Sequence, residues 1–384
     1  MDPIYIIGTG LAGYNLAKEI RKTDKDTPLT LISADSGYFY SKPMLSNALA
    51  AKKPPTAIAL NTPEQMATQI NATVFPKTRV TAINPKDNTL QIGDKTYPYS
   101  RLVLALGADQ IQLPIKGEGA KHVISVNDLD DYGQFHAMLE GTKTVVIIGA
   151  GLIGSEFAND LRHAGHEVRV IDVSAHPLGR LLPPEAGDLI RQKLEALGVQ
   201  WHLGTSVNAI QIENEKLRVE LTNGHTLEAD IVLSAVGLKP RTQLAQAAGL
   251  SVQRGICVNR QLQTSQANIY ALGDCMEIEG MVLPYVMPIM HAVRALAATL
   301  TGKPTNVVFP AMPVMVKTPA CPTIVSPPAM NHVGHWHIEP SETGMKSLFK
   351  DSEGRLLGFA LQGSATAERA KLATELPAVL PAIT

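Results

Sequence analysis

The sequence lacks a surplus of charge of either sign. Its 34 lysines and arginines are balanced by 35 aspartates and glutamates, which gives a formal net charge of −1 at pH 7. Proteins that bind nucleic acid normally carry a basic excess, so we expect no nucleic-acid partner. Any electrostatic attraction to a partner must therefore come from a local patch of charge.

Cysteine is scarce as well, and no two cysteines form a C-x-x-C pair. The sequence therefore indicates neither a disulfide framework nor a zinc or iron site. Three histidines, His332, His335 and His337, stand close together but lack matched acidic partners in sequence. We interpret them as surface residues of a hairpin rather than metal ligands. The three cysteines are Cys257, Cys275 and Cys321.

Long hydrophobic runs are also missing. The apolar run that begins at Val145 is interrupted by Gly149, Gly151 and Gly154, and no other run is long enough to span a bilayer. The first predicted strand begins at residue 4, so we expect no secretory signal peptide. These features predict a cytoplasmic protein that does not insert into a membrane.

A glycine fingerprint is present at the start of the chain. The apolar run Ile4–Ile7 is typical of a buried parallel strand, and it leads directly into Gly8-x-Gly10-x-x-Gly13 and a helical segment. In dinucleotide-binding units of this kind the three glycines permit a tight turn, close approach of a diphosphate and close packing of helix on strand, in that order. Asp35, about 20 residues further on, is placed to bind ribose hydroxyls. The predicted diphosphate-binding residues are Gly8, Thr9, Gly10, Leu11, Ala12 and Gly13.

The same fingerprint occurs a second time. Residues Val145–Ile148 lead into Gly149-x-Gly151-x-x-Gly154 and a predicted helix over 155–164. The next strand ends at Asp172, where an acidic side chain binds free ribose hydroxyls and repels a 2′-phosphate. No arginine follows Asp172 directly, so the sequence favours NADH over NADPH.

Three further apolar strands end in small residues, which let a chain approach a ligand or cross into another domain. We predict them near residues 102–108, 231–236 and 269–274. The small or acidic residues that mark their ends are Ala105, Gly107, Gly237, Gly273 and Asp274. For Asp274 two interpretations stay open, a contact to polyol hydroxyls or a simple helix cap.

This order of elements predicts an α/β fold with two Rossmann-like dinucleotide-binding domains and a small α+β C-terminal domain. The first domain is expected to be discontinuous, over residues 1–108 and 237–305, with the second inserted over 109–236. Residues 306–384 have a different character and form the predicted C-terminal domain.

Two lysines and a glutamate allow more than one interpretation. Lys42, beside Pro43, could hold a phosphate or a flavin, or it could be a solvated loop lysine; Ser41 or Ser46 could cap a short helix there. Lys317, which precedes the stiff pair Thr318-Pro319, is either solvated or aimed at a bound ring. Glu156 either faces the nicotinamide or is an acidic residue favoured near a helix N-terminus.

The joint pattern resembles the FAD-dependent pyridine nucleotide oxidoreductases of glutathione-reductase-like fold, in which FAD uses the first and last segments and NAD(P)H an inserted domain. The resemblance covers the whole chain. Within that superfamily, the stretches Tyr-Ser-Lys-Pro-Met-Leu-Ser at 40–46, Leu-Gly-Asp-Cys at 272–275 and Val-Lys-Thr-Pro-Ala-Cys-Pro at 316–322 resemble the bacterial rubredoxin–NAD(+) reductase family. Close relatives of that family include the reductase that serves flavorubredoxin.

The resemblance implies roles for individual residues. The FAD diphosphate would lie on residues 8–13 and its ribose near Asp35, while Lys42, Glu156 and Lys317 would be the catalytic residues. By this resemblance Lys42 would contact the flavin or a phosphate, the backbone of Val80 the adenine, and Asp274 the ribityl chain. Val286 would contact the pyrimidine edge of the flavin and Lys317 the isoalloxazine. Glu156 would lie on the path of hydride.

The implied activity is transfer of hydride from NADH to FAD and of single electrons from flavin to rubredoxin, a small acidic iron protein. Such a reductase supplies alkane hydroxylation or the removal of oxygen or nitric oxide. An NADH-dependent ferredoxin or flavorubredoxin reductase is the alternative, although the aromatic residue that covers the flavin near Lys317 in aromatic-oxygenase ferredoxin reductases is missing.

Two other classes are less well supported. Disulfide reductases, peroxidases and NADH oxidases of this architecture use a cysteine where Ser41 stands, so a thiol mechanism lacks its nucleophile. The non-enzymatic alternative is a flavin-binding interaction protein.

Overall fold

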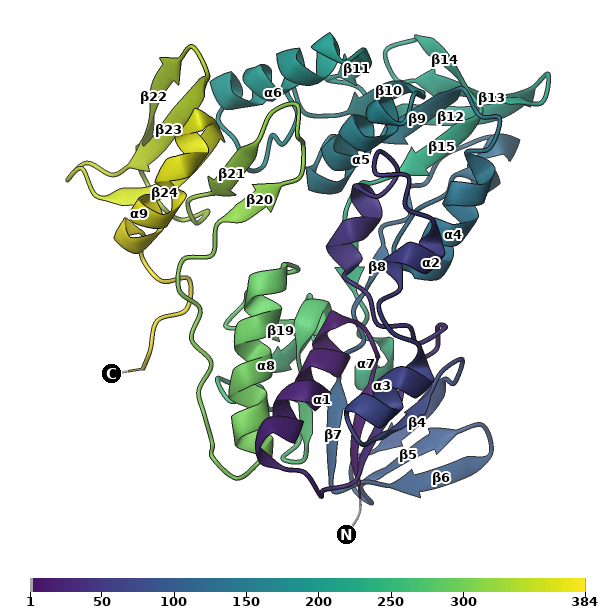
Figure 1. Cartoon of the computed structure of the whole chain (residues 1–384), viewed down its shortest axis with the longest axis vertical. Coiled ribbons are helices and arrows are strands. Elements are labelled where there is room, and N and C mark those ends of the chain that lie inside the picture. Colours follow the sequence, from purple (N-terminus) through teal and green to yellow (C-terminus); the bar gives the residue numbers. More distant parts are fainter. Residues whose placement is uncertain (1–2, 384) are drawn as a thin grey trace.

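The computed structural model describes residues 3–383. Its first unit is built on a five-stranded parallel sheet with the order β18-β7-β1-β2-β3 (Figure 1). The central strands are buried along their whole length, and this explains why their sequences are continuous apolar runs. The strands are β1 (Ile4–Ile7), β2 (Leu29–Ile32), β3 (Thr73–Phe75), β7 (Arg101–Leu104) and β18 (Ile269–Ala271).

One apolar core joins this sheet to the elements around it. Helices α1 and α8 lie side by side although almost the whole unit separates them in sequence (Figure 1). A small antiparallel sheet, β4-β5-β6, contributes to the same core. The elements are α1 (Leu11–Thr23), α3 (Pro63–Gln69), β4 (Val80–Asn84), β5 (Thr89–Ile92), β6 (Lys95–Pro98), α7 (Gln243–Ala247), β17 (Ile256–Val258), η3 (Gly273–Cys275), β19 (Met276–Ile278) and α8 (Val286–Leu300).

A second unit repeats the design with a four-stranded parallel sheet, β11-β10-β9-β15, and a three-stranded antiparallel sheet, β12-β13-β14. Its elements are η2 (Glu118–His122), α4 (Leu129–Met138), β9 (Thr144–Ile148), α5 (Leu152–His163), β10 (Glu167–Asp172), α6 (Pro184–Ala196), β11 (Val199–Leu203), β12 (Val207–Glu213), β13 (Lys216–Leu221), β14 (Thr226–Ala229) and β15 (Ile231–Ser234).

The chain passes between the two units twice, and the two passages pair with each other. Strands β8 (Ala108–Gln110) and β16 (Leu238–Pro240) form an antiparallel ribbon. Arg241 strengthens it, since its Nε donates to Asp109 at 2.6 Å and its backbone N–H to the Gly107 carbonyl at 3.0 Å. The ribbon therefore fixes how the second unit leaves and rejoins the first.

The C-terminal part is an antiparallel sheet, β20-β21-β24-β23-β22, with a short helix packed on it. The last residues return to the first unit, where Leu380 pairs with Phe309. The elements are β20 (Val314–Val316), β21 (Thr323–Ser326), β22 (His335–Ser341), β23 (Gly344–Lys350), β24 (Leu356–Gly363), η4 (Ser364–Glu368) and α9 (Arg369–Glu375).

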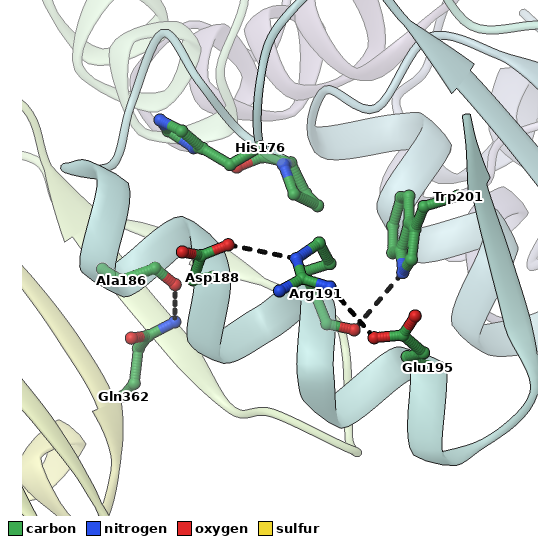
Figure 2. A network of polar contacts seen from close by, with 8 residues as sticks. His176, Ala186, Asp188, Arg191, Glu195, Trp201 and Gln362 are labelled. Carbon is green, nitrogen blue, oxygen red and sulfur yellow. Dashed lines mark hydrogen bonds and ion pairs between the residues drawn. The ribbon is translucent and has the colours of Figure 1, made fainter. Parts of the chain in front are cut away.

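The C-terminal sheet is joined to the second unit by a buried side chain. Gln362 on β24 donates through Nε2 to the Ala186 carbonyl in the first turn of α6 at 2.9 Å (Figure 2). Further along α6, Arg191 binds acidic side chains of its own helix, and its carbonyl accepts from Trp201 Nε1 at 3.3 Å. The bond from Gln362 thereby fixes strand β24 of the C-terminal sheet to the first turn of α6 in the second unit.

One apolar core crosses all three parts of the molecule. It contains side chains from the short helices η1 (Lys42–Ser46) and α2 (Pro55–Ile58), from α5 and from the C-terminal sheet. Representative members are Leu45, Ile58, Phe157, Leu161, Val316 and Val325. Helix α5 lies at the centre of this core, next to the second glycine loop.

The expected fold class is confirmed, with some differences in the elements. The sequence of residues 73–83 predicts a single strand, but the segment forms two strands in different sheets, because Lys77 adopts a positive φ of 50° in the turn between them. The helix expected over 155–164 begins earlier, at Leu152. The sequence of residues 366–374 predicts one closing helix, but the segment is divided into η4 and α9. Within residues 3–383 no helix is long and apolar enough to cross a membrane.

Candidate functional site

The first glycine loop has the geometry that its spacing predicts. Gly8 has a φ of +118°, and a Cβ on it would lie 2.1 Å from the Ala105 carbonyl oxygen. A Cβ on Gly13 would lie 1.9 Å from the Gly8 carbonyl oxygen, so the helix packs directly on the turn. Around Gly10, in contrast, there is open space, and no side chain caps the helix that Leu11 begins. The loop thus offers backbone N–H groups to an anion at a helix N-terminus.

The end of strand β18, where small residues were noted in the sequence, lies against this loop. Gly273 lies against the first turn of α1, where a Cβ on it would be 3.1 Å from the Ala12 Cβ. Asp274, the next residue, makes no side-chain hydrogen bond or ion pair to the described residues. Burial raises the pKa of this carboxyl, and nearby Lys42 opposes the rise. An oxygen-rich acceptor without a protein partner fits polyol hydroxyls better than a helix cap does.

Other predicted contacts lie around the same loop. Asp35 uses Oδ1 to accept from Ser33 Oγ at 2.5 Å and from the Gly37 N–H at 2.9 Å, which leaves its other oxygen open to a ligand. Val80 is buried at the start of β4, and Val286 is 39% exposed at the first position of α8. An open glycine turn, an unpaired half-buried carboxylate and an exposed helix N-terminus fit the diphosphate, ribityl chain and ring of FAD.

The second glycine loop repeats this geometry. A Cβ on Gly154 would lie 1.8 Å from the Gly149 carbonyl oxygen, whereas Gly151 faces open space. Asp172 accepts from the Ala150 N–H at 2.6 Å through Oδ2 and from the Ser174 N–H at 2.7 Å through Oδ1. Its carboxylate is thereby held against the loop at the carboxyl end of β10, where a ribose binds in folds of this kind.

Glu156 and Lys317 meet in a buried ion pair that also includes Ser46. The Lys317 ammonium binds Glu156 Oε2 and donates to Ser46 Oγ at 2.8 Å. Ser46 Oγ in turn donates to Glu156 Oε2 at 2.5 Å, and the Lys317 backbone N–H donates to Oε1 at 3.0 Å. The side chain of Glu156 is 4% exposed and that of Lys317 is 23% exposed. The ion pair was not predicted, and it shows that Lys317 is charge-paired rather than solvated.

Two more polar side chains of α5 reach the same segments. Asp160 accepts from the backbone N–H groups of Leu49 and Ala50 at 2.9 and 3.0 Å. Asn159 accepts from the Ala320 N–H at 3.2 Å. Burial raises the pKa of Asp160, and the two backbone hydrogen bonds act in the opposite direction. One helix face therefore holds both the loop that carries Lys42 and the loop that carries Lys317.

Lys42 is half-buried and hydrogen-bonded rather than freely solvated. Its Nζ donates to Asn127 Oδ1 at 2.8 Å, and burial lowers the pKa of the ammonium, with Asp274 opposing and Arg241 adding to the effect. Lys42 stands at the start of η1, near Asp274 and close to the connecting ribbon.

The thiols are unsuited to a redox relay. Cys275 and Cys321 are buried and Cys257 is half-buried, and all three are free. Burial raises the pKa of Cys275 to about 12 and also raises those of Cys257 and Cys321. A nucleophilic thiol needs the opposite shift. Residues 3–383 also contain no group of three or more His, Cys, Asp or Glu residues that could hold a metal ion.

Sequence reasoning missed several members of the site. Ser46 was considered only as a helix cap, and that expectation is wrong because its hydroxyl serves Glu156. Asn159 and Asp160 have a signal in sequence, since polar residues at these positions interrupt the buried face of α5. Asn127 has no such signal in the sequence, because it lies in a loop and its partner Lys42 is 85 positions away.

Comparison with known proteins agrees with this geometry. Residues 2–298 match the family model described as pyridine nucleotide-disulphide oxidoreductase, and residues 306–376 match the rubredoxin binding C-terminal domain. The chain is 47% identical to a rubredoxin-NAD(+) reductase of Alcanivorax borkumensis, over 99% of this chain and 100% of the relative. It is 36% identical to a nitric oxide reductase FlRd-NAD(+) reductase of Vibrio vulnificus, over 98% of each chain.

A solved structure has the same architecture. The crystal structure of a ferredoxin reductase from Rhodopseudomonas palustris superposes with a TM-score of 0.89 at 26% identity, over 99% of this chain and 96% of that one. The family model covers most of the chain, and the curated relatives align with it from end to end. The chain therefore belongs to the pyridine nucleotide-disulphide oxidoreductase family and, within it, to the rubredoxin–NAD(+) reductases.

Proposed function

We propose that this protein is a reductase that takes hydride from NADH and delivers single electrons to rubredoxin. The observation that carries the proposal is the Glu156–Lys317 pair, which anchors the C-terminal part on α5 directly beside the second glycine loop. That part matches a rubredoxin-binding domain. One pair of side chains thus connects the proposed nucleotide site with the proposed partner site.

FAD supplies the chemistry when bound, since a flavin accepts a hydride and releases electrons one at a time. The chain's own residues bind and orient it. In our proposal residues 8–13 hold its diphosphate, Asp35 its ribose and Asp274 its ribityl hydroxyls, while Ala105, Gly107 and the backbone of Val80 line the cavity. Val286 meets the pyrimidine end of the ring.

The same proposal assigns the chain to domains. Residues 1–108 and 237–305 bind FAD, residues 109–236 bind NADH through Gly149, Gly151 and Gly154, and residues 306–384 receive the partner. Gly237 returns the chain to the first domain. The paired strands β8 and β16 support this division because both passages lie in one ribbon.

The nucleotide preference rests on Asp172. Its carboxylate is fixed by two backbone N–H groups, so it cannot turn away from a 2′-phosphate without losing both bonds. We expect NADH to be preferred over NADPH by about 100-fold in kcat/KM. Because the three thiols are free, we further propose a reducing, cytoplasmic location.

Steady-state assays with several acceptors test the proposal. The purified protein should be yellow, should lose its flavin absorbance on addition of NADH without a partner, and should reduce rubredoxin faster than ferredoxin or oxygen. Oxygen as the best acceptor would make the protein an oxidase and would contradict the proposal. The 36% identical Vibrio vulnificus relative makes flavorubredoxin the second candidate acceptor, so it belongs in the same assay.

A further inference from the structure

The two lysines of the site have different partners. Lys317 is paired with the carboxylate of Glu156. Lys42 forms no ion pair with any residue in 3–383, and its Nζ is held at 2.8 Å by a neutral acceptor, the Oδ1 of Asn127. Asp274, Asp128 and Asp131 act on Lys42 as negative charges, but none of them forms an ion pair or a hydrogen bond with it. The positive charge of Lys42 is therefore fixed in position without being neutralised by a direct partner.

Asn127 is itself held from two sides. Its Nδ2 donates to the Ala108 carbonyl at 2.9 Å, and its backbone N–H donates to Asp131 Oδ2 at 2.9 Å. Because the amide carries its donor and its acceptor on opposite sides, the bond to Ala108 turns Oδ1 toward Lys42. The side chain is buried, with 8% of the residue exposed.

The amide is chemically suited to this position. A carboxylate of the same size would form an ion pair with Lys42 and cancel its charge, and would also face the Ala108 carbonyl with a second oxygen. An apolar side chain would leave the buried ammonium without its acceptor, and a long lysine side chain would then sample other rotamers. Only a neutral group with both donor and acceptor keeps the charge present and in place.

We propose that Asn127 is a positioning residue, which holds the Lys42 ammonium beside the flavin as a positive charge without a direct ion-pair partner and ties that position to the connecting strand β8 through Ala108. The inference rests on the proposed FAD site. A fixed positive charge near the ring stabilises the electron-rich reduced flavin, so Asn127 should influence the flavin midpoint potential through its hold on Lys42.

A double-mutant cycle on the holoenzyme tests this inference, with the midpoint potential of bound FAD as the readout. Asn127→Ala and Lys42→Met should each lower the potential, and Asn127→Asp should lower it more than Asn127→Ala. In the Lys42→Met background, Asn127→Ala should cause no further shift, because Asn127 acts only through Lys42. Asn127→Ser replaces Asn127→Ala if the alanine variant does not retain FAD.

Three outcomes would overturn the inference. The first is an Asn127→Asp variant with the parent potential. The second is an Asn127→Ala shift of equal size with and without Lys42, and the third is FAD bound at the parent potential in both the alanine and the serine variant. Failure of the proposed function is recognised separately, because the parent protein would then contain no FAD or would not be reduced by NADH. A yellow, NADH-reducible parent with unresponsive Asn127 variants contradicts the positioning role alone.

Discussion

At the scale of residues, the site is organised by how each buried charge is compensated. Glu156 has a lysine, a serine hydroxyl and a backbone N–H, whereas Asp274 has no hydrogen-bonding partner in the described chain and Lys42 has an amide. Buried charges without partners are unfavourable for folding. They remain reasonable where a ligand completes them, as FAD hydroxyls would do for Asp274.

The Glu156–Lys317 pair gives the first prediction. Lys317→Met leaves a buried carboxylate unpaired, and breaking a buried pair costs about 3–5 kcal/mol, with the partial exposure of Lys317 favouring the lower end. We expect a lower Tm and a lower flavin potential. Glu156→Gln combined with Lys317→Met removes both charges and should recover most of both losses.

Thermal unfolding and potentiometry of the parent, the two single variants and the double variant check this prediction. The four measurements also separate a pair from two independent charges. A double variant that loses as much stability as the two single variants combined would show that the two side chains do not act as a pair.

The carboxyl of Asp274 gives a prediction with a defined pH dependence. Burial raises its pKa above the ordinary value of 3.8, so the stability contributed by its protonated form is complete below that value and is lost as pH rises through the raised one. In flavin-free protein, Asp274→Asn should therefore raise the Tm at pH 7 and change it little below pH 4. The same variant should bind FAD about 10- to 100-fold more weakly, because charged hydrogen bonds to the hydroxyls are lost.

Differential scanning fluorimetry from about pH 3 to pH 8 and flavin-binding titrations measure the two effects. Asp274→Glu keeps the charge and serves as the control for the pH dependence. If Asp274→Asn destabilises flavin-free protein at pH 7, the carboxylate is a structural cap and the ribityl assignment loses its support.

At the scale of elements, each glycine loop contains two glycines that the fold needs and one that it does not. A Cβ on Gly154 would overlap the Gly149 carbonyl, but a Cβ on Gly151 would meet nothing within 4 Å. Gly151→Ala should therefore leave the Tm almost unchanged and weaken NADH binding, because the added methyl group occupies the approach of the diphosphate.

Gly154→Ala is the matched control for this substitution. Its methyl group would separate α5 from the turn, and overpacking of this kind costs about 1–3 kcal/mol or more. Tm and NADH titrations of the two variants distinguish the roles. Equal NADH affinity for the parent and Gly151→Ala would mean that the diphosphate does not lie on this loop.

The same elements show what the sequence could predict. Buried parallel strands followed by glycine turns have strong local patterns, so β1, β9 and their loops were expected correctly. Contacts between segments far apart in sequence have no such pattern. The pairing of Glu156 with Lys317 spans 161 positions, and that of Ser46 with Glu156 spans 110. These contacts depend on how the three parts pack, which neither periodicity nor spacing encodes.

At the scale of the whole molecule, α5 links the parts, and net charge contributes little to partner binding. The chain carries a formal charge of −1, so an acidic partner is attracted only by local positive charge. In the C-terminal part, Arg369 and Lys371 are exposed on α9 and form no ion pair with residues 3–383. Arg369 lines a groove with Met287 of α8 and Met312, next to the helix N-terminus proposed to meet the flavin.

Salt dependence of electron transfer tests this location of the partner site. Raising the ionic strength from about 0.01 M to 0.3 M shortens the screening length several-fold, so kcat/KM for rubredoxin should fall while NADH oxidation with a neutral quinone stays nearly constant. Arg369→Glu with Lys371→Glu should lower the rubredoxin rate at low salt and flatten its salt dependence. Lys86→Glu, an exposed charge change on the turn between β4 and β5, is the control and should behave like the parent. Equal salt slopes for parent and α9 variant would place the docking surface away from this helix, because charges that steer a partner must lie where it lands.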